Sequence, residues 1–131
     1  MTIGLMMAAW TLVLAFVQIL LFDIARTSQY GMKWNTGPRD GEMPPLSPRA
    51  ERLKRAQDNL FETLPLFLGA VLIAHVADKE NEITALGAQI YFWARVAYVP
   101  LYAWGVRHLR SLVWLVSIVG LGMIAQAILI P

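Results

Sequence analysis

The sequence predicts an all-α membrane protein built as a bundle of four transmembrane helices. Apolar residues make up 57% of the 131-residue chain and charged residues only 15%, and the mean hydropathy is positive at +0.52. Four apolar runs are long enough to cross about 30 Å of hydrocarbon at 1.5 Å per residue. The length leaves room for one domain, residues 1–131, and for no separate soluble module.

The apolar runs, in chain order, are Ile3–Phe22, Leu60–Ala77, Ile83–Val106 and Leu112–Ile130. The first run lacks a basic segment before it and a small-residue cleavage site after it, so we interpret it as a retained helix rather than a signal peptide. With flanking residues included, the expected helices cover about 3–25, 48–77, 83–106 and 111–130.

Residues 27–47 are expected to form an irregular loop. Glycine and proline interrupt this segment repeatedly, which disfavours regular helix. Its end is marked by Ser47 followed by Pro48, the pattern of an N-cap with proline at the first helical position. The second helix therefore starts well before its apolar run.

Basic side chains are concentrated in the first and third connections. The first connection and the start of the second helix hold Arg26, Lys33, Arg39, Arg49, Arg52, Lys54 and Arg55, and the third holds Arg107 and Arg110. The positive-inside rule then makes these two loops cytoplasmic and places both termini outside. Because topology explains the basic residues, we expect no nucleic-acid partner.

Two expected spans carry polar stripes at helical spacing. Arg55, Asn59 and Glu62 lie at i, i+4 and i+7, and Arg95 shares a face with Tyr98 and Tyr102. A charge at the bilayer centre costs about 2.5–3.5 kcal/mol on insertion scales, so such residues usually face a bundle interior or a functional site. The alternative is a structural ion pair between Glu62 and Arg95.

Several chemistries are not supported by the sequence. The chain has no cysteine, and the expected topology puts His75 and His108 at opposite membrane faces, so we expect no metal site. Catalytic-triad, phosphate-loop and dinucleotide motifs are missing from the sequence. Any chemistry must therefore come from a bound small molecule together with polar side chains of the bundle.

Glutathione matches this set of side chains. Its two carboxylates, ammonium and thiol call for arginines, an acid and a donor directed at sulfur. The cytoplasmic half of the bundle supplies all three kinds of group. They are the arginines Arg55, Arg95, Arg107 and Arg110, the acids Asp58 and Glu62, and the donors Asn59, Tyr98, Tyr102 and Ser111.

The motifs resemble the MAPEG family of membrane proteins in eicosanoid and glutathione metabolism. The resemblance is carried by Arg55-Ala-x-x-Asn59-x-x-Glu62-x-x-Pro65-x-Phe67, by Arg95 with Tyr102 seven residues later, and by Leu109-Arg110-Ser111. It implies a homotrimer that binds glutathione between subunits near the cytoplasmic face. The implied glutathione-binding residues are Arg26, Arg55, Asn59, Glu62, Arg95 and Tyr98. Arg26 would reach the site of a neighbouring subunit.

The resemblance also implies a reaction, in which glutathione thiolate attacks a lipophilic electrophile or a lipid hydroperoxide from the membrane. Arg110 is the expected thiolate-stabilising group, with Ser111 and Tyr102 as alternative donors. Asp58 and Tyr98 stand where the prostaglandin-synthase branch has arginine and histidine, so eicosanoid substrates are not carried over. The loop around Trp34 resembles that of bacterial members, which implies the bacterial inner membrane.

Two other functions stay open at this point. The family also includes non-catalytic lipid-binding members, which would have little need of the arginine and carboxylate set. A small four-helix multidrug transporter is the third possibility. It would be expected to carry an acid within the first span, and Ile3–Phe22 has none.

Overall fold

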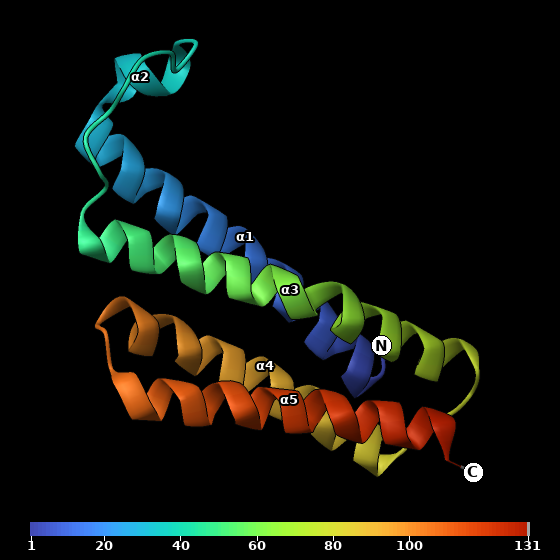
Figure 1. Cartoon of the computed structure of the whole chain (residues 1–131). Helices are drawn as coiled ribbons and strands as arrows, with labels where there is room; N and C mark the ends of the chain where they lie inside the picture. Colours follow the sequence, from blue (N-terminus) through green and yellow to red (C-terminus); the bar gives the residue numbers. More distant parts are fainter. Residues whose placement is uncertain (131) are drawn as a thin grey trace.

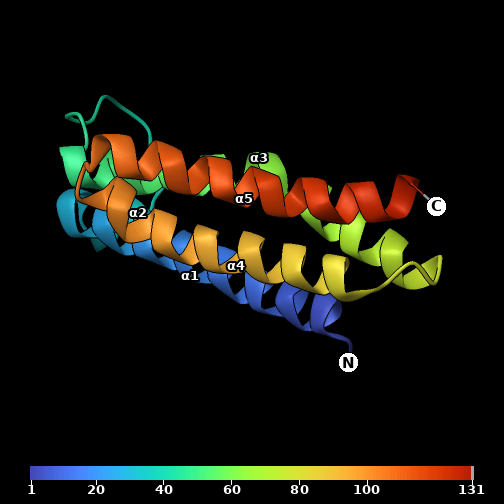
Figure 2. The same cartoon turned by 90° about the horizontal axis from the view of Figure 1, so that it is seen from below.

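The computed structural model describes residues 1–130, and regular structure in them is helical. Five helices follow one another along the chain (Figure 1): α1 (Ile3–Tyr30), α2 (Met32–Thr36), α3 (Pro48–Val76), α4 (Glu82–Ala103) and α5 (Arg107–Leu129). The four long helices lie side by side, and the start of α1 and the end of α5 lie toward the end of the bundle opposite α2 (Figures 1 and 2). The predicted all-α bundle is confirmed.

Three of the long helices, α1, α3 and α5, are long and apolar enough to cross a membrane. Large apolar side chains on α1 and α5, such as Phe16 and Val119, are more than half exposed, as expected of surfaces that face lipid. The fourth long helix, α4, whose apolar run was also expected to span the membrane, is not among these three, and its polar residues Tyr91, Arg95 and Tyr98 are buried. The chain is an integral membrane protein.

The predicted start of the second membrane helix is correct. Ser47 is the N-cap of α3, its side-chain oxygen accepts a hydrogen bond from the backbone N–H of Ala50, and Pro48 is the first helical residue. At the opposite end of the bundle, Asn81 and Thr84 form a reciprocal capping box that starts α4.

The expected irregular loop is partly wrong, because residues 27–30 continue α1 and Met32–Thr36 form α2. Gly31 separates the two helices. Gly31 has a φ of 93°, a backbone conformation that glycine adopts more readily than other residues, and α1 ends there. Its N–H donates a hydrogen bond to Thr27 O. The irregular part is therefore limited to residues 37–47, where glycine and proline are most frequent.

The third connection is also shorter than predicted. The helix α4 ends at Ala103, and Gly105, with a φ of 72°, makes the turn into α5. Because α5 begins at Arg107, four residues before the predicted start at 111, Arg110 lies with Ser111 in the first turns of the helix rather than in the loop. Their positions are thus fixed by a helix.

The bundle core is packed around aromatic and small side chains. The ring of Phe67 on α3 stacks on that of Tyr91 on α4 with centroids 4.0 Å apart, and the Tyr91 hydroxyl hydrogen-bonds Thr63 at 2.7 Å. The closest helix approach joins α4 to α5, where a Cβ on Gly87 or Gly120 would lie 2.6 Å from the carbonyl oxygen of the other glycine. Small residues at this crossing allow the two backbones to touch.

The carboxylate of Glu80 links α1 to α3 at the end of the bundle opposite α2. Glu80 accepts a hydrogen bond from Thr2 Oγ1 at 2.6 Å and contacts His75 Nδ1 at 2.8 Å, which joins the start of α1 to the end of α3. The hydrogen bond from Thr2, and then that from His75, lower the pKa of Glu80 below its usual value. Both contacts favour the ionised carboxylate.

Candidate functional site

The two polar stripes meet inside the bundle. Arg95 on α4 is 1% exposed, and its Nη1 donates to Asn59 Oδ1 on α3 at 2.8 Å. The guanidinium also lies 4.4 Å from the centre of the Tyr98 ring, one turn further along α4. The structure therefore brings Asn59, Arg95 and Tyr98 together, three of the residues that the sequence analysis selected.

Most of the donor capacity of Arg95 is unused. Its Nε and Nη2 are both buried without a hydrogen-bond acceptor among residues 1–130. A buried donor without an acceptor costs about 1–3 kcal/mol, more when it is charged. A ligand that brings carboxylate or carbonyl oxygens to Arg95 would remove this cost, so the site fits an anionic ligand.

Tyr102 lies between two further arginines. Arg55 Nε donates to the Tyr102 hydroxyl oxygen at 3.2 Å, and the guanidinium of Arg110 lies 4.5 Å from the centre of the Tyr102 ring. Tyr98 meets the same ring edge-on, with centroids 5.5 Å apart. Because its oxygen accepts from Arg55, the phenol proton of Tyr102 is free to donate to a ligand.

A cavity of about 190 Å³ opens beside these residues. Its lining comes from three helices and consists of Asn59, Tyr98, Arg110, Ser111 and Trp114. Ligand pockets usually measure about 300–1,000 Å³. The cavity of one chain therefore holds only part of a tripeptide-sized ligand.

Trp114 is the one lining residue that was not selected from the sequence. The signal was present in the spacing. Trp114 follows Arg110 by four residues on a continuous helix, which places both on one face of α5.

Glu62 is not paired with Arg95 within residues 1–130. The Glu62 side chain is exposed on α3, and no ion pair within residues 1–130 joins it to Arg95. The structural ion pair considered as an alternative is therefore not formed within one chain.

Asp58 also lies at the surface. Its carboxylate pairs with Lys54 at 3.0 Å, and both side chains are about half exposed.

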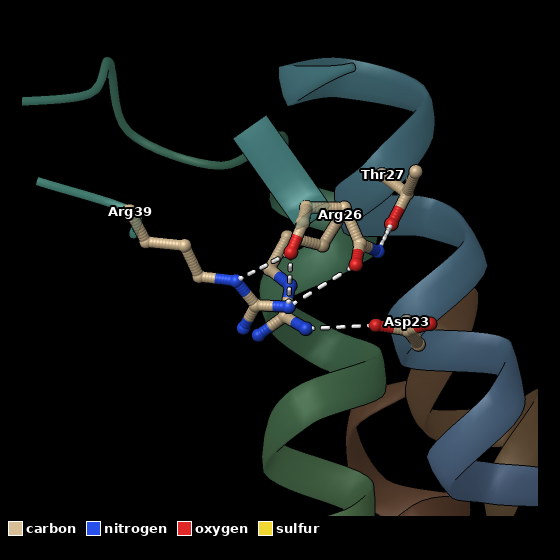
Figure 3. A network of polar contacts seen from close by, with 5 residues as sticks. Asp23, Arg26, Thr27 and Arg39 are labelled. Carbon is tan, nitrogen blue, oxygen red and sulfur yellow. Dashed lines mark hydrogen bonds and ion pairs between the residues drawn. The ribbon is translucent and has the colours of Figure 1, made fainter. Parts of the chain in front are cut away.

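Arg26 is not brought to the other candidate residues. Its Nη2 contacts Asp23 at 2.8 Å (Figure 3), and its guanidinium lies 5.0 Å from the Phe22 ring centre and 5.2 Å from that of Trp34. Ser111 is exposed, and its hydroxyl makes only a long 3.5 Å hydrogen bond to the Arg107 carbonyl.

These features define a helical integral membrane protein with a polar site, lined by arginine and tyrosine, between its helices. The chain belongs to the MAPEG family, whose model matches residues 7–130. It is similar to leukotriene C4 synthase of Bos taurus, 34% identical over 94 residues, and to that of Rattus norvegicus, 35% identical over 94 residues. Each match covers 63% of this chain and 62% of the relative, so less than two thirds of either enzyme is represented.

Proposed function

We propose that this protein is a membrane-bound glutathione transferase or peroxidase that acts on lipophilic electrophiles or lipid hydroperoxides. The observation that carries the proposal is the buried guanidinium of Arg95, which has two N–H groups without acceptors beside a cavity lined by Arg110 and Tyr98. Membership of the MAPEG family supports glutathione as the ligand.

Each group of glutathione has a counterpart in the site. The arginines Arg55 and Arg95 match its carboxylates, and Asn59 matches its amide groups. The carboxylate of Glu62 matches its ammonium. Arg110 is the proposed partner of sulfur, since a neighbouring cation increases the thiolate fraction. Tyr102 and Ser111 are the alternative donors.

The active form is proposed to be a homotrimer. The small cavity of one chain and the exposed Glu62 on a membrane helix both support a site that is completed by a neighbouring copy. Arg26 of one copy would then serve the site of the next. The basic end of the bundle would face the cytoplasm, with both chain termini outside, in a bacterial inner membrane.

In the proposed reaction the thiolate attacks the electrophilic carbon of an apolar substrate, and a carbon–sulfur bond forms as the leaving group departs with the bonding electrons. With a hydroperoxide, the thiolate sulfur takes the terminal oxygen, the alcohol leaves after protonation, and a second glutathione yields the disulfide and water. Arg110 would hold the thiolate in both cases.

A non-catalytic lipid-binding role is the second candidate. An apolar groove of about 330 Å³ runs between α3 and α5 and is lined by residues that include Pro65, Leu66, Gly69, Ile73 and Leu129. Its size and apolar lining suit an acyl chain, either as a bound lipid or as the tail of a substrate that enters from the bilayer.

Calorimetric titration of glutathione into the detergent-purified protein tests the proposal. We expect binding that weakens at least about tenfold in Arg95→Ala, because a charged partner is removed from the ligand. Arg49→Ala, which changes an exposed arginine outside the site, is the matched control and should bind normally. Equal affinity of the two variants would refute the site.

Turnover separates the two candidates. Ultraviolet absorbance of bound glutathione near neutral pH should show thiolate, and the protein should turn over an aryl halide or a lipid hydroperoxide. We expect Arg110→Ala to lose the thiolate signal. Glutathione binding without thiolate and without turnover would favour the non-catalytic role.

A further inference from the structure

A second, larger cavity lies at the α2 end of the bundle. It measures about 360 Å³, and the lining residues that matter here are Tyr30, Lys33, Trp34, Arg39, Asp40 and Met43, at the end of α1, on α2 and in the following segment. We call it the cap pocket. It shares no lining residue with the cavity beside Arg110, so it is separate from the proposed glutathione site.

The wall of the cap pocket is an ordered structure. The Asn35 side-chain amide donates to the Thr27 hydroxyl at the end of α1, and Arg39 Nε and Nη2 donate to the Asn35 carbonyl oxygen at 3.2 and 3.1 Å (Figure 3). Gln29 fixes the return of the chain, since its amide donates to Pro45 O and its oxygen accepts from Ser47 N. The segment after α2 is thus bonded to α2 at its start and to α1 at its end.

Arg39 adopts an unusual backbone conformation. Its φ of 60° lies in the left-handed region, which residues other than glycine rarely occupy. Such residues persist only where the surroundings hold them, and they cluster at ligand-binding sites. Here the conformation brings the Arg39 guanidinium to 4.7 Å from the centre of the Trp34 ring.

The pocket has more donors than acceptors. The indole N–H of Trp34 is buried without an acceptor, and neither Lys33 nor Arg39 takes part in an ion pair within residues 1–130. Together these groups suit a phosphate, which offers several strong acceptor oxygens. Asp40 supplies a carboxylate in the same pocket, so a ligand that also carries a donor group matches the lining best.

We propose that the cap pocket binds a phosphate ester whose alcohol part carries an ammonium or hydroxyl group. Lys33, Arg39 and the Trp34 indole N–H hold the phosphate, Asp40 accepts from the ammonium or hydroxyl, and Tyr30 and Met43 form the apolar wall. The volume of about 360 Å³ lies within the usual range for a small-molecule pocket.

The position in the membrane allows two sources for this ligand. The apolar run of α1 ends at Phe22, and Tyr30 lies eight residues further, about 12 Å along the helix. The headgroup layer extends about 5–8 Å beyond the hydrocarbon on each side. Along the helix axis the pocket thus begins about 4–7 Å beyond the headgroup layer, where a soluble phosphate ester reaches it directly and a phospholipid headgroup would have to rise out of its layer to bind.

Two probes distinguish these sources with the full-length protein. O-Phosphoethanolamine is titrated calorimetrically into the detergent-purified protein, and lipid retention is measured by native mass spectrometry from nanodiscs of phosphatidylethanolamine and phosphatidylcholine. Binding of either probe supports the proposal. The soluble probe alone indicates a soluble ligand, and selective retention of phosphatidylethanolamine alone indicates a headgroup. Binding of neither overturns the proposal.

Variants locate the binding. We expect Arg39→Gln and Lys33→Gln each to weaken binding of the probe about tenfold. Trp34→Phe, which keeps an aromatic ring but removes the N–H, should weaken it about fivefold. Arg49→Gln outside the pocket is the matched control and should bind normally. Asp40→Asn should weaken phosphoethanolamine but not inorganic phosphate. If the Lys33, Trp34 and Arg39 variants all bind the probe like Arg49→Gln, the assignment of the pocket is wrong. If Asp40→Asn weakens phosphoethanolamine and inorganic phosphate equally, the role of Asp40 is refuted.

Discussion

The crossing of α4 and α5 can be tested with two glycines of one helix. Gly120 faces Gly87, and a Cβ at Gly120 would lie 2.6 Å from the Gly87 carbonyl oxygen and 2.8 Å from the Tyr91 backbone nitrogen. Gly122 has no such neighbour within 4 Å of the corresponding Cβ position. Gly120→Ala and Gly122→Ala are therefore the same chemical change on the same helix in opposite surroundings.

The two substitutions are expected to change the free energy of unfolding in opposite directions. Replacing a helical glycine by alanine favours the helix by about 0.8–1 kcal/mol, and Gly122→Ala should be neutral or slightly stabilising. At Gly120 the new methyl group meets backbone atoms that cannot rotate away, and overpacking typically costs about 1–3 kcal/mol. Gly120→Ala should therefore lower the free energy of unfolding by up to about 2 kcal/mol after the helix gain is subtracted.

Thermal unfolding in detergent, followed by circular dichroism, measures the difference between the two variants. The crossing also sets the position of Arg110 on α5 relative to Tyr98 on α4, so Gly120→Ala should weaken glutathione binding as well. Equal midpoints for Gly120→Ala and Gly122→Ala would refute the close approach of the two helices.

Three further predictions concern the site and the far end of the bundle. If Arg55 acts through Tyr102, Arg55→Ala and Tyr102→Phe should each lower the fraction of bound glutathione present as thiolate about fivefold. The double variant should then lose no more of this fraction than the more affected single variant does. If the two losses multiply in the double variant, the two residues act independently. Glu62→Gln should weaken glutathione binding at least about tenfold with the trimer intact in native mass spectrometry, and unchanged affinity would exclude Glu62 from the site. The pKa of Glu80 is lowered in the folded protein, so its contribution to stability is present above about pH 4.5 and is lost as pH falls through the folded pKa. The fall in thermal midpoint on acidification should accordingly be smaller in Glu80→Gln than in the unchanged protein.

The sequence was sufficient to predict the four long helices of the bundle and the start of α3, because apolar length and the Ser47–Pro48 cap are local signals. It also selected Asn59, Arg95 and Tyr98, since helical spacing puts polar residues on one face before any contact is known.

The helix α2 and the end of α1 could not be predicted in the same way. Glycine and proline recur through residues 27–47, yet the helical part of this segment is stabilised by contacts that are distant in sequence, such as the Gln29 hydrogen bonds to Pro45 and Ser47. The exposure of Glu62 could not be predicted from the sequence either. Helical spacing indicates on which face of the helix a residue lies, but not whether another helix of the same chain covers that face.

The tryptophan of α2 has a consequence for how the protein can evolve. The indole ring of Trp34 packs against two arginines, with the guanidinium of Arg26 5.2 Å and that of Arg39 4.7 Å from the ring centre. Loss of the ring would leave both guanidinium groups without their aromatic contact, and loss of Arg39 would leave the ring without one of its two cationic neighbours. Substitutions at these three positions should therefore accumulate together rather than singly, so the loop between the first two membrane helices should be inherited as a unit.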